Sequence, residues 1–202
     1  MGTFMQSRDL FPEVYERTMR NERGSNSSNV LGYVNDKRDA GQETLSGISR
    51  RYHPEWEGWA VVDAHKYTGM FPSDLHEDTK LNAMIRNFYR RNFWDSQSFS
   101  DIVDADIAFV IFDIYVLTGR TEPAQQAINA FYHQSIVKVD GKIGAMTVRE
   151  LNIISTSITE KEEYLRILTG AVLGYLLHGK DWNTWGKGWT DRFLSNIEEI
   201  VG

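Results

Sequence analysis

Acidic and hydroxyl side chains gather in one short stretch of the sequence, between residues 22 and 44. Glu22 stands at the end of an expected helix, and Asp36, Asp39 and Thr44 follow in a glycine-rich segment. A glutamate at a helix end that faces a cleft can donate a proton, because partial burial raises its pKa. A second carboxylate and a hydroxyl can stabilise charge and hold water, which is the arrangement that cleavage of a glycosidic bond requires.

Each of these residues also has a purely structural interpretation. Glu22 fits an exposed helix acid, and Asp39 fits an Asx turn with Gly41. Asp36 fits turn structure better than catalysis, whereas Thr44 fits a strand, which favours its branched side chain. Because acids beside a turn are usually solvated or capping residues, spacing alone favours the structural interpretation.

The element that would carry Glu22 is a helix over residues 9–22. Its apolar stripe follows the i, i+3, i+4, i+7, i+8 spacing of one helix face: Phe11, Val14, Tyr15, Thr18 and Met19. Asp9 can cap the start of this helix, and Gly24 is expected to end it. The Ser/Asn-rich residues 24–29 are a loop.

The rest of the chain is expected to be mainly helical. Segments 32–35 and 44–49 are expected to pair as a small β-hairpin, and 59–65 to form a short helix. Beyond residue 73 a helix is expected around residues 74–89, and five more follow: 105–117, 122–132, 145–153, 158–177 and 189–200. The segment 105–117 is the most apolar, and its length fits a buried core helix rather than a membrane span.

Composition excludes several classes of function. The formal net charge is −6 and the isoelectric point is near 5.4, which argues against a nucleic-acid-binding protein. No cysteine is present, so disulfides and Cys-ligated metal sites are excluded. His53 and His65 lack the spacing of helical metal ligands, and we expect no metal and no cofactor. Residues 1–20 contain no apolar stretch of the kind found in a signal peptide.

Aromatic residues near the acidic stretch are candidates for binding a saccharide. Tyr33, Trp56 and Trp59 can stack on sugar rings, although core packing fits Trp59 at least as well. Asp113 lies inside the apolar segment 105–117. It is therefore either buried and paired or exposed in a cleft, where it would bind substrate.

Short motifs stand in a specific order along the chain. In the first half they are YVND at 33–36, DAG at 39–41, ET at 43–44, GIS at 47–49 and RRYHPEWEGW at 50–59. In the second half they are DGKIG at 140–144 with Thr147, then Arg166 and Gly188-Trp189 with Arg192. In these motifs the chain resembles glycoside hydrolase family 108, a family of phage endolysins and bacterial N-acetylmuramidases. The resemblance extends from about residue 11 to residue 195, and it is the order of the motifs that is specific.

The resemblance implies a mainly α, lysozyme-like helical fold with a small β-hairpin. Residues 1–104 would form the catalytic part. Residues 105–202 would form a helical part that resembles a peptidoglycan-binding region and shares one core with the first. The implied activity is that of an endolysin-type muramidase, which cleaves the β-1,4 bond between N-acetylmuramic acid and N-acetylglucosamine and so lyses bacterial cells. Glu22 would be the acid, and Asp39 and Thr44 would stabilise charge and place water.

The implied substrate-binding residues are Tyr33, Asp36, Trp56, Trp59 and Asp113, and the implied partner is bacterial peptidoglycan. We expect a monomer without a membrane span. It would be made in the bacterial cytoplasm and reach the cell wall through a holin pore, on a virion or by another export route.

One departure from the family pattern leaves two alternatives open. In the family the catalytic glutamate directly precedes Gly-Gly-Tyr, whereas Val30, Leu31 and Gly32 precede Tyr33 here. An insertion of the Ser/Asn loop after Glu22 accounts for this, because surface loops tolerate insertions at little cost. Alternatively, Val30 replaces the acid, and the protein binds peptidoglycan without cleaving it. A plain helical interaction protein would require the ordered motif matches to be accidental.

Overall fold

The computed structural model describes residues 8–23, 31–35, 42–179 and 182–201, with the backbone alone at 22–23 and 183–185. The chain divides into two compact units. One comprises Met1–Val14 and Asn92–Gly202, and the other comprises Tyr15–Arg91. The first helix, α1 (Phe11–Arg23), contributes its first turn to the former unit and the rest to the latter.

The helix α1 forms where the sequence predicts it. Its apolar stripe is buried, with Val14, Thr18 and Met19 fully inaccessible to solvent. Asp9 accepts a hydrogen bond from the backbone N–H of Phe11 at 3.2 Å, which satisfies one of the free donors at the helix start. The predicted range 9–22 is shifted by one or two residues, which is the usual uncertainty of a helix end.

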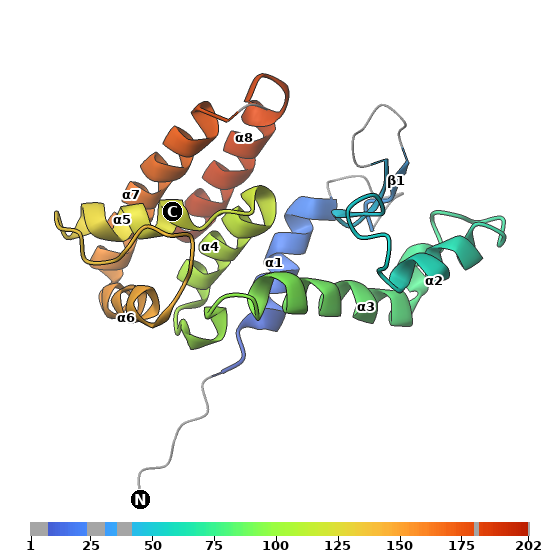
Figure 1. Ribbon diagram of the computed structural model, residues 1–202, viewed down its shortest axis with the longest axis horizontal. Helices are drawn as coiled ribbons and strands as arrows, with labels where there is room; N and C mark the ends of the chain where they lie inside the picture. The colour runs from blue at the N-terminus through green and yellow to red at the C-terminus, as the bar shows by residue number, and fades with distance from the viewer. Residues whose placement is uncertain (1–7, 24–30, 36–41, 180–181, 202) are drawn as a thin grey trace, which may run out of the picture. The chain divides into compact units, whose positions relative to one another are not determined.

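The unit Tyr15–Arg91 contains a small antiparallel sheet with strand order β1-β2-β3 (Figure 1). Strands β1 (Val34–Asn35), β2 (Glu43–Leu45) and β3 (Ile48–Ser49) replace the simple hairpin that the sequence predicts. Residues 44–49 form a tight hairpin by themselves, since Ser46 and Gly47 both adopt positive φ angles, as a two-residue turn requires. Segment 32–35 then adds the third strand, β1.

Two helices complete this unit, α2 (Gly58–His65) and α3 (Thr79–Tyr89), with the short 3₁₀ helix η1 (Leu75–Glu77) between them. Asp78 caps α3 by accepting from Leu81 N at 2.8 Å. One face of α3 is buried through Leu81, Ile85, Phe88 and Tyr89. The Tyr89 hydroxyl donates to the Ser46 carbonyl at 2.6 Å, which fixes the β2–β3 turn against α3.

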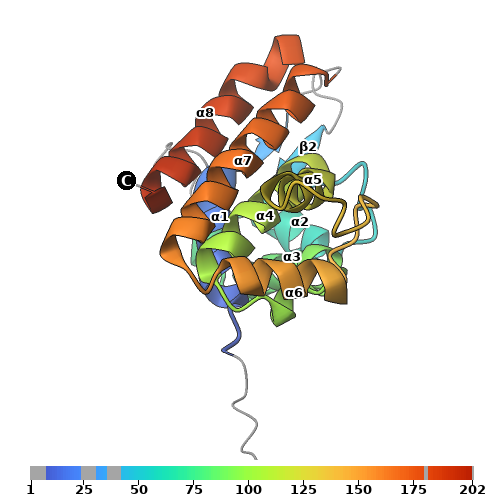
Figure 2. The same ribbon diagram turned by 90° about the vertical axis from the view of Figure 1, so that its left-hand side faces the viewer.

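The other unit is helical. The π-helical turn η2 (Arg90–Trp94), of which Asn92–Trp94 belong to this unit, and a 3₁₀ turn, η3 (Phe99–Asp101), lead into the longer helices. These are α4 (Ala105–Thr118), α5 (Glu122–Phe131), α6 (Ala145–Ile154), α7 (Ile158–Leu177) and α8 (Trp182–Val201). Helices α7 and α8 lie side by side, and α5 also packs on α7 (Figure 2).

Helix α4 forms the centre of this unit's core. Residues 107–114 are all buried, and the helix starts at the cap Asp104 and ends at Gly119, whose φ of 68° suits glycine. Trp94 packs against Phe11, Phe99 and Phe112, with ring centroids 5.2–5.5 Å apart. No helix among the described residues is long and apolar enough to cross a membrane. The order of the elements confirms the predicted mainly α fold with a small β element.

Candidate active site

Glu22 occupies the next-to-last position of α1, in the unit that also contains the sheet. Position 22 follows Thr18 by four residues and Met19 by three, so it continues the spacing of the buried stripe. Thr18 is fully buried, and no described residue forms a hydrogen bond with its Oγ1. Because an unpaired buried hydroxyl costs about 1–3 kcal/mol, Thr18 lowers the stability that this otherwise apolar stripe contributes.

The other predicted acids lie outside the described residues. Asp36 and Asp39 both fall in segment 36–41, for which no structure is described. Thr44 is the middle residue of the central strand β2, opposite Val34 on one side and Ser49 on the other. Glu43 and Leu45 are buried whereas Thr44 is half-buried, so Thr44 lies on the sheet face opposite to theirs.

Glu43, which the sequence motif includes but the predicted site does not, anchors the sheet. Its side chain accepts hydrogen bonds from the Tyr33 hydroxyl at 2.9 Å and from Arg50 at 2.7 Å. Lys66 Nζ lies 2.7 Å from Glu43 Oε1. Glu43 is only 8% exposed, and such a carboxylate is retained in a protein only when it is paired. The contact with Lys66 ties the sheet to the segment directly after α2.

A second carboxylate completes this charged cluster. Asp63 on α2 accepts from both Nη atoms of Arg50, at 3.0 and 2.7 Å, and from Lys66 at 2.7 Å. The hydrogen bonds from Arg50, and then those from Lys66, lower the pKa of Asp63 to about 2. The cluster of Glu43, Arg50, Asp63 and Lys66 therefore holds β2, the residue after β3 and α2 together.

The three predicted aromatic residues differ in accessibility. Trp59 is 3% exposed, its Nε1 donates to the His53 carbonyl at 2.8 Å, and the Arg50 guanidinium lies 4.7 Å from its ring centre. Trp56 is half-buried and meets Trp59 edge to face. Tyr33 is half-buried, with its hydroxyl on Glu43. Trp59 thus has the surroundings of a core residue, whereas Trp56 and Tyr33 each keep an accessible part.

Asp113 lies in the other unit and is 1% exposed. It accepts two hydrogen bonds from Arg192, at 3.0 and 2.7 Å, and one from Asn196 at 2.8 Å. Of the two alternatives for this residue, the geometry matches a buried pair that joins α4 to α8.

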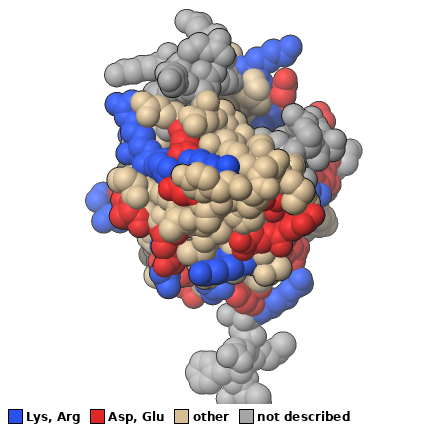
Figure 3. Space-filling view, turned by 90° about the vertical axis from the view of Figure 1, so that its right-hand side faces the viewer, with Lys and Arg blue, Asp and Glu red and all other residues tan. Residues whose placement is uncertain are grey.

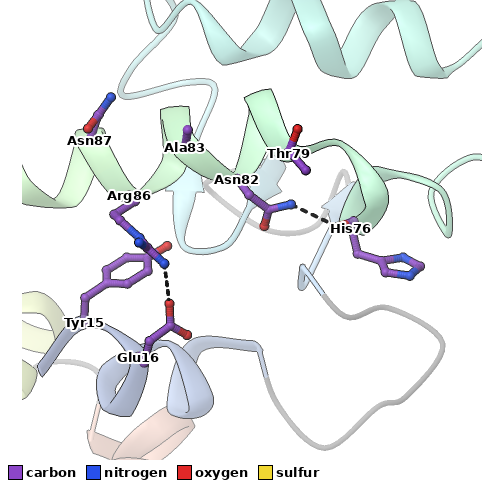
Figure 4. A pocket seen from close by; sticks show the side chains of 8 residues that line it. All are labelled: Tyr15, Glu16, His76, Thr79, Asn82, Ala83, Arg86 and Asn87. Carbon is purple, nitrogen blue, oxygen red and sulfur yellow. Dashed lines mark hydrogen bonds and ion pairs between the residues drawn. The ribbon is translucent and has the colours of Figure 1, made fainter. Parts of the chain in front are cut away.

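A polar groove between α1 and α3 was not predicted from the sequence. It has a volume of about 520 Å³ and lies wholly within the unit Tyr15–Arg91. Figure 4 shows the eight residues that line it: Tyr15, Glu16, His76, Thr79, Asn82, Ala83, Arg86 and Asn87. Five of these stand on α3 at the i, i+3, i+4, i+7, i+8 spacing of one helix face. That polar stripe is the signal from which the groove's α3 wall could have been found.

An ion pair crosses the groove between the two helices. Arg86 Nη2 donates to Glu16 Oε1 at 2.8 Å, and the guanidinium lies 5.4 Å from the ring centre of Tyr15. Both charged side chains are about half exposed, so the pair itself adds little to stability. No group of three or more metal-ligating side chains occurs among the described residues.

Comparison with known proteins gives a family and a fold. The chain is similar in fold to the solved structure of Brucella abortus SagA, with 21% sequence identity and a TM-score of 0.59. The match covers 95% of this chain and 93% of that one. No curated protein matches the chain. The sequence model described as Glycosyl hydrolase 108 matches residues 17–119, which include α1 from Arg17 onward, the sheet and the α3 wall of the groove. The chain therefore belongs to glycosyl hydrolase family 108.

Proposed function

We propose that this protein is an N-acetylmuramidase, which hydrolyses the β-1,4 bond between N-acetylmuramic acid and N-acetylglucosamine in peptidoglycan. The observation that carries the proposal is the place of Glu22. The family match includes it, and it stands at the end of α1, in the unit that contains the sheet with Thr44. Family membership supports hydrolysis of a glycosidic bond in general, and the motif resemblance supports peptidoglycan as the substrate.

In the proposed mechanism Glu22 donates a proton to the glycosidic oxygen as the bond to the sugar breaks. This role requires a carboxyl whose pKa is raised, as partial desolvation in a substrate cleft raises it. Asp39 stabilises the positive charge that develops on the sugar ring. Thr44, on the accessible face of β2, positions the water molecule that completes the hydrolysis.

The test compares wild type with Glu22→Gln, which keeps the size of the side chain and removes its acidic proton. Loss of a general acid lowers a rate by about 10²- to 10⁴-fold. We expect wild type to release new reducing ends from purified peptidoglycan sacculi, and Glu22→Gln to release them slower by this factor. After borohydride reduction, mass spectrometry should find N-acetylmuramitol at those ends.

The matched control is Glu13→Gln, an equivalent change on the same helix. Glu13 is paired with Arg8 at the surface, and loss of that pair costs little. Equal activity of wild type and Glu22→Gln would mean that another group is the acid. If N-acetylglucosaminitol is found instead, the bond assignment is wrong. If no variant releases reducing ends while all sediment with sacculi, the protein only binds peptidoglycan.

A further inference from the structure

The groove between α1 and α3 has the lining of a carbohydrate site. Its volume of about 520 Å³ lies in the range of small-ligand sites, roughly 300–1,000 Å³. Its α3 wall presents a hydroxyl and two amides, from Thr79, Asn82 and Asn87. Hydroxyl and amide groups both donate and accept, as do the hydroxyl and acetamido groups of a sugar.

Asn82 is held in one orientation. Its Nδ2 donates to the carbonyls of His76 and Asp78, each at 2.9 Å, so the amide is fixed to the start of α3. In the described part of the chain its Oδ1 has no hydrogen-bond partner, and Figure 4 shows that oxygen directed toward α1. The groove therefore contains a preorganised acceptor, which costs no side-chain entropy when a donor binds.

The charges of the groove cancel across it. Arg86 and Glu16 form an ion pair, so the lining carries one positive and one negative group besides His76. A site for the carboxylates of a stem peptide would instead need unpaired cations. The balance favours a ligand that is polar and uncharged.

We propose that this groove binds the sugar backbone of the glycan strand, next to the bond that is cleaved. The inference rests on the proposed function for the identity of the glycan. Glu16 and Glu22 stand six residues apart on α1, which is about 9 Å along a helix axis. The groove and the proposed acid thus belong to the same helix and the same unit, and Asn82, Asn87 and Arg86 are binding residues.

The test fills the groove at its smallest side chain. Ala83 is exposed on α3, and Ala83→Tyr puts a bulky ring into the groove without disturbing the buried face. Ala60→Tyr is the matched control, because Ala60 is also exposed on a helix of the same unit, α2, and does not line the groove. A second variant, Asn87→Ala, removes one exposed amide.

Binding is measured by calorimetry on the full chain carrying Glu22→Gln, with peptide-free glycan strands and with free stem peptides as separate ligands. We expect Ala83→Tyr to weaken glycan binding by at least about tenfold, the worth of one or two net hydrogen bonds, and Ala60→Tyr to leave it unchanged. Asn87→Ala should weaken it by about threefold to tenfold. With Glu22 intact, Ala83→Tyr should raise KM more than it lowers kcat.

Three results separate this inference from the proposed function. Unchanged glycan binding in Ala83→Tyr overturns the groove assignment, whatever the reducing-end assay shows. Stem peptides that bind while glycan strands do not overturn it as well. If no variant cleaves peptidoglycan but Ala83→Tyr still abolishes glycan binding, the groove assignment stands and the hydrolase proposal falls.

Discussion

At the scale of single residues, the buried carboxylate of Asp113 shows how a charge is kept inside this protein. It lies within an otherwise apolar helix face and is held by Arg192 and Asn196, 79 and 83 residues further along the chain. Removing one partner of such a pair leaves the other buried and uncompensated, which costs more than the pair contributes. A substitution of Asp113 should therefore change the free energy of unfolding rather than the affinity for a ligand.

We predict that Asp113→Asn lowers the free energy of unfolding by about 3 kcal/mol, the cost of removing the buried carboxylate that pairs with Arg192, whose side chain is only 13% exposed. Urea denaturation measures this value. Glycan binding, measured on the folded fraction, should be unchanged. A loss of glycan affinity with unchanged stability would instead support the substrate-binding role that the sequence suggested.

At the scale of elements, His65 joins the end of α2 to the start of α3. Its two ring nitrogens lie 2.8 Å from Asp74 and 3.1 Å from Asp78, and Thr68 donates to Asp74 at 2.6 Å. The hydrogen bond to Asp74, and then that to Asp78, raises the pKa of His65. The pKa of Asp74 is lowered by Thr68 and then by His65. The pKa of Asp78, which caps α3, is lowered first by the N–H of Leu81.

The directions of these pKa shifts determine whether the stability of the folded state rises or falls with pH. Because the pKa of His65 is raised in the folded state, its protonated form stabilises that state, and this contribution is fully present at pH values below the ordinary pKa near 6.5. The contribution is lost as the pH rises through the folded-state pKa. The lowered pKa values of Asp74 and Asp78 add stability that is lost only in acid. We predict that wild type loses more stability than His65→Gln between about pH 6 and pH 9.

Thermal unfolding followed by circular dichroism across this pH range gives the comparison. His178→Gln is the control, because His178 is exposed at the end of α7 and its Nδ1 lies 2.8 Å from a backbone carbonyl. Parallel pH profiles of wild type and His65→Gln would show that the histidine does not stabilise the junction between α2 and α3 through its charge.

At the scale of the whole molecule, the protein carries a net charge of −6 although its proposed substrate is itself anionic. On the face seen in Figure 3, acidic and basic side chains both occur around a broad area without charge. Salt screens the mutual repulsion, since the Debye length falls from about 30 Å at 0.01 M to about 8 Å at 0.15 M. Oligomers of β-1,4-linked N-acetylglucosamine, by contrast, carry no carboxylate and are uncharged.

We therefore predict that kcat/KM on sacculi rises between these two salt concentrations, whereas the affinity for uncharged oligomers of N-acetylglucosamine changes little. Initial rates at low substrate concentration measure the first quantity, and calorimetry measures the second. Activity that falls steeply with added salt would contradict the prediction and would point to a basic surface that attracts the wall.

The sequence predicted those helices whose signals are local. The cap at Asp9 and the apolar spacing of α1 each act within one or two turns, so they can be recognised without the rest of the fold. Helix α8 begins at Trp182 instead of the predicted 189. It includes Gly186, where a side chain would overlap the Trp182 ring, so the packing within the helix favours glycine there.

By itself, the sequence determined the family, the mainly α class and the place of Glu22 near the end of α1, since these depend on motif order and on helical periodicity. Only the tertiary structure decided which polar residues meet. Glu43 forms an ion pair with Lys66, Asp113 with Arg192, and Glu16 with Arg86, and each pair joins residues more than twenty positions apart. These pairs, and the groove that the ion pair of Glu16 and Arg86 spans, depend on how the loops bring distant segments of the chain together. No local sequence pattern specifies that arrangement.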